Sequence, residues 1–334
     1  MYLDVSMAEL PFVTALAAVE HDVRVGRVIV WGPGSLSNLG PGFDALGLCI
    51  QGLGDRVEAW RTETPGVHLV EANGLPGSRI PEDPQTNTAA VAAAAVLRLV
   101  AAQHGIALRL RKGLPAGSGL GSSAASAVAG AWAANLLLEQ PLPREALVEA
   151  VLEGEFVAAG SRHGDNVLAA LFGGLVLVSA SNPSVYRRIP LPAPLSIALI
   201  LPQVEILTRT ARDILPREVA LRDAVHNAAA LAFLVDAFRC GDWETVGRWM
   251  MADRLVEPVR ATLVPCYEAV RRAALEAGAF GCALTGSGPS MFALAKDEQH
   301  AQRILSAMLE ASNQSGIAAQ GFVTAVDEEG VRQL

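Results

Sequence analysis

The chain has 334 residues, of which 51% are hydrophobic and 18% are charged, and its formal net charge is −8. This length allows two domains with separate cores. The negative charge argues against general nucleic-acid binding, so an anionic substrate must be attracted by a local positive site. No apolar run reads as a membrane span of roughly 20 residues, and the sequence predicts a soluble protein with neither nucleic acid nor membrane as a partner.

Residues 1–22 are expected to form an N-terminal extension outside the domains. They contain a short apolar run together with Asp4 and Glu9, where a secretory signal would carry lysine or arginine. The four cysteines of the chain are widely spaced without a C-x-x-C pair, which suits a reducing compartment and argues against a zinc site. These features predict a cytoplasmic protein.

The first domain is expected to span residues 23–185 and to begin with a strand, a loop and a second strand. Residues 23–30 alternate weakly in polarity, the turn-rich stretch 32–44 follows, and the apolar segment ALGLCIQ covers residues 45–51. This order places a glycine-rich loop between two neighbouring strands.

An alanine-rich segment from Thr88 to His104 predicts a helix. Thr86 or Asn87 could cap the start of this helix, and Gly105 would end it. The alternating residues 107–113 then predict a short strand that leads into the next motif.

The stretch KGLPAGSGLGSSAAS, from Lys112 to Ser126, joins this strand to a helix expected at residues 122–140. Its glycines fit neither G-x-x-x-x-G-K-[ST] nor G-x-G-x-x-G. Glycines still allow positive φ and close backbone approach, and the free N–H groups of a helix N-terminus favour an anion. Because that helix end supplies only about half a unit charge, a triphosphate would also need a metal ion and hydroxyls such as Ser122 and Ser123. Taken alone, the stretch could almost equally be a flexible turn that caps a helix.

The rest of the chain reads as further helices and strands. Residues 142–159 predict a helix and residues 173–180 a buried strand. A cluster of prolines in residues 183–194 marks the domain boundary, so the second domain is expected at residues 186–334. Its predicted elements are a strand at 195–202, two or three helices between Arg217 and Gly278, a strand, turn and strand at 282–295, and a final helix and strand.

Three motifs carry a resemblance to a known family: GPGSLSNLGPGFDALGL at residues 32–48, P-x-G-S-G-L-G-S-S-A-A at 115–125 and CALTGSGPSMFAL at 282–294. Together they resemble the GHMP kinases, the family of the galactokinase, homoserine, mevalonate and phosphomevalonate kinases. The segments SNLGPGFDALGL at 37–48, SRHGDN at 161–166 and TRTARDILP at 208–216 are similar to its homoserine kinase branch. The likeness begins near residue 24 and reaches the C-terminus.

The resemblance implies an α+β fold with two domains. The N-terminal, ATP-binding domain would contain a left-handed β-α-β unit, which breaks the usual right-handed rule, and the C-terminal domain would be ferredoxin-like, with the active site between the two. The implied reaction is the ATP-dependent phosphorylation of L-homoserine to O-phospho-L-homoserine, with Mg²⁺, in threonine biosynthesis. A homodimer is expected by analogy alone.

By resemblance, the glycine-rich stretch wraps the ATP phosphates. The residues implied are Pro115, Ala116, Gly117, Ser118, Gly119, Leu120, Gly121, Ser122, Ser123, Ala124 and Ala125. Asn87, Lys112 and Thr208 are further nucleotide contacts in this reading. Lys112 is one of two lysines in the chain, the other being Lys296, and this scarcity favours a function for Lys112 over a solubilising role at a strand end.

The resemblance assigns Mg²⁺ to Ser123 and Glu155. Hard oxygen ligands suit magnesium, which keeps several waters and takes few protein ligands. Glu153 is the near competitor for this role, and the eight-residue step from Glu155 to His163 favours Glu155.

Homoserine is a zwitterion, so its pocket needs a fixed cation for the carboxylate, acceptors for the ammonium and a polar group at the hydroxyl. Arg212 and Arg260 align with the family's carboxylate-binding arginines, and a forked guanidinium can grip both oxygens. The resemblance places Asn38, His163 and Asn166 among the groups around the amino and hydroxyl ends.

Two aspartates could orient or deprotonate the nucleophilic hydroxyl. Asp44 is the first choice, although an aspartate in GPGFD could instead brace a turn through its own backbone. Asp165 is the alternative, because the aspartate at this place serves as a base in mevalonate-type members. Phosphoryl transfer depends mostly on positioning and charge neutralisation, so the two roles stay open.

Two other functions compete with this one. A GHMP kinase for another small alcohol, such as mevalonate, would need neither the paired arginines nor His163. A catalytically silent relative that only binds a nucleotide would have no use for metal-binding and hydroxyl-positioning groups together. The late loop, residues 285–290, is expected to complete the wall of the site by contacting the glycine-rich stretch. Trp31 and Gly32 depart from the family pattern, which begins this motif with A-P-A-S or A-P-A-T, and they could reshape the pocket wall or repack a strand end.

Overall fold

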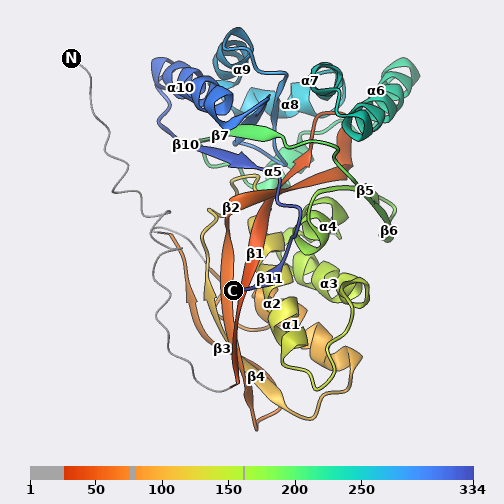
Figure 1. The fold of residues 1–334 in the computed structure, drawn as a ribbon, viewed down its shortest axis with the longest axis vertical. Coiled ribbons are helices and arrows are strands. Elements are labelled where there is room, and N and C mark those ends of the chain that lie inside the picture. The colour runs from red at the N-terminus through yellow and green to blue at the C-terminus, as the bar shows by residue number, and fades with distance from the viewer. Residues whose placement is uncertain (1–25, 76–79, 161) are drawn as a thin grey trace, which may run out of the picture.

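The computed structural model describes residues 26–75, 80–160 and 162–334, and the expected extension at residues 1–22 lies outside the described residues. Two β-sheets form the frame, a seven-stranded sheet in the lower part of Figure 1 and a four-stranded sheet in the upper part. In the described part of the chain, no helix combines the length and apolarity that crossing a bilayer requires.

The seven-stranded sheet is built on a long antiparallel hairpin. Its strand order is β11-β1-β2-β4-β3, with β5 paired to β2 and β6 paired to β5. The strands are β1 (Arg27–Asn38), β2 (Gly42–Thr62), β3 (Gly66–Asn73), β4 (Gly105–Arg111), β5 (Leu175–Ser179), β6 (Asn182–Ile189) and β11 (Arg332–Gln333). The expected loop at residues 32–44 is wrong, because residues 35–37 pair with residues 47–49 of β2 and leave only a tight turn at residues 39–41.

Helices cover one face of this sheet (Figure 1). They are α1 (Thr88–Leu99), α2 (Ser122–Leu136), the 3₁₀ segment η1 (Arg144–Leu147), α3 (Val148–Ala159) and α4 (Gly164–Phe172). Helices α2 and α4 pack on β1 and β2, while α1 and α3 pack against α2. Small side chains allow this close packing, since a Cβ added at Gly130 of α2 would lie 2.2 Å from the carbonyl oxygen of Ala89 in α1.

Helix α1 starts where the sequence predicts and ends earlier. Its cap is Asn87, whose Oδ1 accepts hydrogen bonds from the backbone N–H groups of Ala89 (3.1 Å) and Ala90 (3.3 Å). The helix ends at Leu99 rather than near Gly105, because the chain turns at Ala101 with φ +48°. Helix α1 joins β3 to β4, which run parallel, and so forms the β-α-β unit that the resemblance implies.

The four-stranded sheet has the order β10-β7-β9-β8, with all neighbours antiparallel. Its strands are β7 (Ser196–Pro202), β8 (Cys282–Leu284), β9 (Met291–Ala295) and β10 (Ala319–Ala325). The first strand of this domain, β7, therefore lies between β10 and β9, and the second strand, β8, lies at the edge of the sheet. This order and the alternation with helices confirm the ferredoxin-like expectation.

The second domain contains more helices than the sequence predicts. They are α5 (Thr208–Asp213), α6 (Leu221–Cys240), α7 (Trp243–Met250), α8 (Glu257–Arg260), the 3₁₀ segment η2 (Ala261–Leu263), α9 (Tyr267–Glu276) and α10 (Glu298–Gln314). The expectation of two or three helices between Arg217 and Gly278 is wrong, because α6, α7, α8 and α9 all lie there. The shortest of them, α8, has four residues, which is too few for apolar periodicity to show.

The two domains share buried structure. Strand β6 crosses the expected boundary between residues 185 and 186 and stays in the first sheet, and β11 returns from the C-terminus to pair with β1. One buried apolar cluster contains residues of both sheets, including Leu36, Leu48, Leu199 and Phe292. This shared core fixes the domains against each other at the end of the hairpin that carries the first motif.

Candidate active site

The glycine loop, residues 113–121, connects β4 to the start of α2. Gly117, Gly119 and Gly121 have φ values of +68°, +77° and +66°, a region that side chains rarely adopt. A Cβ at Gly119 would lie 2.3 Å from the carbonyl oxygen of Thr285, and a Cβ at Gly121 would lie 2.4 Å from Ser35 Oγ. Glycine is therefore required at both positions by backbone conformation and by contact.

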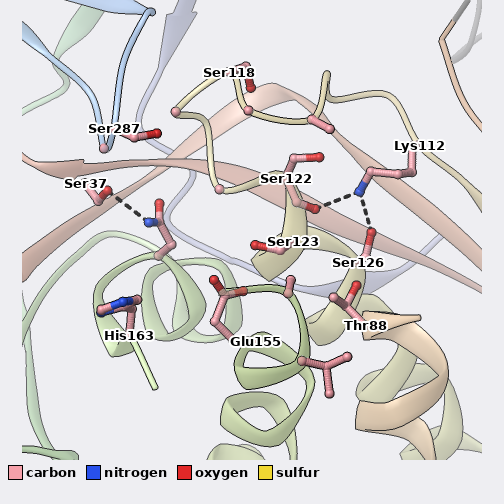
Figure 2. Close-up of a pocket in the computed structure, with 18 of the residues that line it drawn as sticks. Ser37, Thr88, Lys112, Ser118, Ser122, Ser123, Ser126, Glu155, His163 and Ser287 are labelled. Atoms are coloured by element: carbon pink, nitrogen blue, oxygen red, sulfur yellow. Dashed lines mark hydrogen bonds between the residues drawn. The ribbon is translucent and has the colours of Figure 1, made fainter. Parts of the chain in front are cut away.

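The first turn of α2 is open to an anion. Its N-cap is Gly121, and no side chain caps the helix there. The turn faces a cavity of about 500 Å³ lined by both domains. Figure 2 shows Ser118, Ser122 and Ser123 around this cavity. A helix N-terminus beside a glycine loop provides backbone N–H groups for phosphate oxygens.

Most of the residues singled out from the sequence line this one cavity. They are Asn38, Asp44, Asn87, Lys112, Ala116, Gly117, Ser118, Gly119, Gly121, Ser122, Ser123, Glu155, His163, Asp165, Asn166, Arg212 and Arg260. Leu120, Ala124 and Ala125 are buried and are not in the lining, and neither is Pro115. The side chain of Thr208 and the residue Ser161 of the SRHGDN motif lie outside the described residues.

Lys112 reaches the cavity wall, but its ammonium is bonded to protein groups. Nζ lies 2.6 Å from Asp55 Oδ2. It also lies 2.7 Å from Ser126 Oγ and 2.8 Å from the carbonyl oxygen of Ser122 (Figure 2). An ammonium has three donors, so these contacts use all of them. Asn87 is likewise engaged, because besides capping α1 its Nδ2 donates to the carbonyl oxygen of Pro81 at 2.8 Å.

Glu155 on α3 is the buried acid at the centre of the cavity wall (Figure 2). Its side chain hydrogen-bonds Ser123, and its Oε2 has no hydrogen-bond partner. Burial raises the pKa of Glu155 to about 8, and the bond to Ser123 only partly offsets this. Glu153, the competitor in sequence, is instead 43% exposed and paired with Arg98.

Asp44 forms the polar centre at the other end of the cavity. Arg212 Nη1 and Nη2 donate to its carboxylate at 3.0 to 3.2 Å, and His163 Nδ1 lies 3.5 Å from its Oδ1. Asn38 Oδ1 accepts a hydrogen bond from the Asp44 backbone N–H at 3.3 Å. Asn38 and Asp44 both have positive φ, +72° and +55°, and such strain in non-glycine residues clusters at functional sites.

A second arginine, Arg260, lies close to the same aromatic ring as Arg212. Arg260 is 4% exposed and donates to the carbonyl oxygens of Ala211 (3.1 Å) and Gly286 (2.8 Å). Burial first, and then the charge of Arg212, lower the pKa of Arg260 to about 10. The ring of Phe43 lies 5.3 Å from the Arg212 guanidinium and 5.0 Å from that of Arg260, which favours two cations in one place.

Asp165 and Asn166, at the start of α4, complete the site. Burial, followed by the negative charge of Asp44, raises the pKa of Asp165 to about 7. The amide of Asn166 is fixed by two serines of β1, because its Oδ1 accepts from Ser35 Oγ at 2.9 Å and its Nδ2 donates to Ser37 Oγ at 2.9 Å. The cavity therefore holds three buried or half-buried carboxylates, those of Asp44, Glu155 and Asp165, and Asp44 is paired with Arg212.

The late loop closes the wall from the second domain, as expected. Thr285 Oγ1 donates to the carbonyl oxygen of Gly119 at 2.8 Å and accepts from the backbone N–H of Ser37 at 3.1 Å. In Figure 2, Ser287 of this loop lies near Ser37 at one end of the cavity, while Ser126 and Thr88 lie at the other.

Trp31 and Gly32, which depart from the family pattern, take part in packing outside the cavity lining. A Cβ at Gly32 would lie 2.1 Å from the carbonyl oxygen of Ala125, so glycine there allows β1 to approach α2. The ring of Trp31 packs over Gly54, and neither Trp31 nor Gly32 is in the cavity lining. This favours repacking of a strand over a reshaped pocket wall.

Comparison with known proteins identifies the family. The families described as GHMP kinases N terminal domain and GHMP kinases C terminal match residues 87–174 and 234–314. A homoserine kinase of Pyrococcus abyssi is 39% identical over 88% of this chain and 96% of its own length. The chain belongs to the homoserine kinases of the GHMP family.

Further relatives agree with this assignment. A homoserine kinase of Xylella fastidiosa is 38% identical and covers 95% of this chain and 96% of its own. The crystal structure of homoserine kinase from Cytophaga hutchinsonii superposes with a TM-score of 0.88 at 38% identity, covering 92% of this chain and 98% of its own. The family resemblance and the two-domain kinase fold are thereby confirmed, and so is the class of enzyme, an ATP-dependent phosphotransferase that acts on an alcohol.

Sequence reasoning missed two residues that organise the site of this kinase. Asp55 lies within the long strand β2 and carries no motif, and Phe43 sits between two motif residues without polar chemistry of its own. The contact of the late loop with the glycine loop was expected, and the bond from Thr285 to the carbonyl oxygen of Gly119 makes it. The GPGFD segment was the signal for Phe43, whereas Asp55 had none.

The negative charge of Asp44 should have a measurable effect on the pKa of Asp165. Asp44→Asn should lower the pKa of Asp165 from about 7, because it removes a nearby negative charge and leaves the positive charge of Arg212 unpaired. The value should stay above that of an ordinary aspartate, since burial is the larger cause. Carbon-13 NMR titration of labelled carboxyl groups would measure this. Glu257, whose pKa burial raises to about 7 without a contribution from Asp44, is the internal control, and an unchanged Asp165 would contradict the analysis.

Proposed function

We propose that this kinase phosphorylates the γ-hydroxyl of L-homoserine with ATP, using Mg²⁺. The observation that carries the proposal is one cavity with a phosphate-binding glycine loop at one end and the Asp44, Arg212 and His163 cluster at the other. The curated relatives named homoserine kinase cover nearly the whole chain and support the same acceptor.

The charged cluster suits a small amino acid. The substrate carboxylate would bind Arg212, backed by Arg260, and would replace Asp44 as a partner of the Arg212 guanidinium. Asp44, released from that pair, could then accept from the substrate's ammonium or hydroxyl. An acceptor such as galactose has neither a carboxylate to bind Arg212 nor an ammonium to bind Asp44, so it could not replace the contacts between these two side chains.

The reaction needs few covalent steps from the protein. The homoserine hydroxyl oxygen attacks the γ-phosphorus in line, a new O–P bond forms while the bond to the β,γ-bridging oxygen breaks, and ADP leaves. Backbone N–H groups of the glycine loop and of the first turn of α2 bind the phosphate oxygens. The hydroxyl proton passes to Asp44 or Asp165, both of which line the cavity.

The residues present fit Mg²⁺. Glu155 offers a buried oxygen without a hydrogen-bond partner, and the Ser123 hydroxyl bonded to it lies in the first turn of α2. Among the described residues there is no cluster of three or more His, Cys, Asp or Glu side chains that could hold a metal. Two oxygen ligands, with waters and phosphates, suit magnesium. When bound, Mg²⁺ would neutralise charge on the β- and γ-phosphates.

We further propose a cytoplasmic location and a homodimer for this kinase. All four cysteines are free, as thiols are in a reducing compartment. Leu221, Val225 and Phe233 are exposed at four-residue and eight-residue spacings along α6, so they share one side of the helix. This apolar face supports a contact between two copies.

The substrate assignment is tested by release of ADP from Mg-ATP in a coupled assay. Homoserine should stimulate release strongly, while mevalonate, galactose and L-threonine should not, because only homoserine matches both the charges and the hydroxyl position. Stimulation by mevalonate and not by homoserine would replace the proposed acceptor. Tight ATP binding without stimulation by any of them would favour a silent nucleotide-binding protein.

Arg212→Leu should raise the homoserine KM by about ten- to a hundredfold, the cost of one lost charge-assisted contact. The ATP KM should stay nearly constant, because Arg212 lies at the acceptor end of the cavity. Arg209→Leu is the matched control from the same helix, since Arg209 is 91% exposed. Steady-state kinetics with each substrate varied in turn would decide, and equal changes in both KM values would count against the role of Arg212.

Glu155→Gln should raise the Mg²⁺ concentration for half-maximal rate by about tenfold or more, because even indirect partners of a metal contribute this much. Glu153→Gln, two residues away on the same helix and exposed, should behave as the unmodified protein. Rates measured over a series of Mg²⁺ concentrations give both values. If both variants needed the same Mg²⁺ concentration for half-maximal rate, the assignment of Glu155 to the metal site would be wrong.

A further inference from the structure

Asp55 is a fully buried aspartate that lies behind the glycine loop. Its side chain is 0% exposed and is not in the cavity lining. Oδ1 accepts from the backbone N–H groups of Gly113 (3.0 Å) and Leu114 (3.3 Å). Oδ2 accepts from Lys112 Nζ (2.6 Å) and Ser126 Oγ (2.5 Å). A buried charge is tolerated when it is paired and hydrogen-bonded in this way.

These bonds connect the two ends of the loop. Gly113 and Leu114 are its first residues, whereas Ser122 and Ser126 lie in the first turns of α2. Lys112 adds a bond to the carbonyl oxygen of Ser122, and Ser122 Oγ donates to the carbonyl oxygen of Leu114 at 3.0 Å. One carboxylate and one ammonium therefore fix both the entry of the loop and the helix end at its exit.

We propose that Asp55, acting through Lys112, is a positioning residue for the phosphate site. The inference rests on the proposed kinase function. It assigns Lys112 to the bonds that hold the two ends of the glycine loop together, rather than to a direct contact with phosphate. Backbone N–H groups bind phosphate well only when their directions are fixed before binding. A buried ion pair is weak evidence for stability but can select one geometry over others, and here that geometry is the path of the glycine loop along the cavity wall.

The first variant is Asp55→Asn, which keeps the size and shape of the side chain. The amide can still accept from Gly113 and Leu114 through its oxygen, but its NH₂ group would face the Lys112 ammonium and the Ser126 hydroxyl. Binding of Mg-ATP, measured by calorimetry without any acceptor, should weaken by about ten- to a hundredfold. In the coupled assay the homoserine KM should stay nearly constant. Adding Lys112→Met to Asp55→Asn removes the opposed donor and should restore part of the ATP affinity.

Asp327→Asn is the matched control. Asp327 is 3% exposed, accepts from the backbone N–H groups of Glu329 and Gly330 at 3.0 Å each, and pairs with Arg332 at 2.8 Å. It therefore repeats the chemistry of Asp55 beside β11, away from the loop. Both variants should lower the midpoint of thermal unfolding, but only Asp55→Asn should weaken ATP binding.

The outcomes separate this inference from the proposed function. If the unmodified protein binds Mg-ATP and Asp55→Asn binds it equally well, or if Asp327→Asn weakens ATP binding as much, the positioning role is overturned while the kinase function stands. If the unmodified protein binds no ATP, the proposed function fails and the inference with it. Selective loss in Asp55→Asn, with partial recovery in the double variant, supports the positioning role.

Discussion

Close approach of three backbone segments is the constraint on which the site depends. The glycine loop touches β1 through a bond from the Ser35 N–H to the Leu120 carbonyl (3.1 Å), and it touches the late loop through Thr285. The late loop is in turn bonded to β1 by the Gly286 N–H and the Ser37 carbonyl (3.2 Å). A side chain at Gly119 would separate these segments. Since they come from both domains, their contact determines where the phosphate end and the acceptor end of the cavity lie.

Within that frame, the site keeps charged groups in places where water cannot easily solvate them. Burial raises the pKa of Glu155 and of Asp165 and lowers that of Arg260. Asp44 and Arg212 pair across the cavity, at 3.0 Å. Substrate and metal would supply the missing opposite charges, so binding energy is directed to the reacting groups rather than to the stability of the empty site.

Local signals predicted much of the fold, and distant pairing decided what they missed. The Asn87 cap, the start of α2 at Ser122 and the strand-turn-strand at residues 282–295 depend on neighbours within a few residues, and the structure confirms them. The predicted loop at residues 32–44 is mostly strand, because its backbone bonds to β2. The C-terminal strand β11 joins the first sheet, and no residue near β11 in the sequence predicts this pairing.

The sequence by itself determined which residues could do the chemistry: the glycine pattern requires a positive-φ loop before a helix, and motif likeness identified the kinase family. Only the tertiary structure decided what those residues bind. Arg212 meets Asp44 across 168 positions of sequence, and Lys112 is held by Asp55, 57 positions away, rather than facing the cavity unpaired. The physical reason is the separation along the sequence over which each kind of interaction acts. Backbone preference and helix ends are set by adjacent residues, whereas the partner of a charged side chain is set by folding of the whole chain.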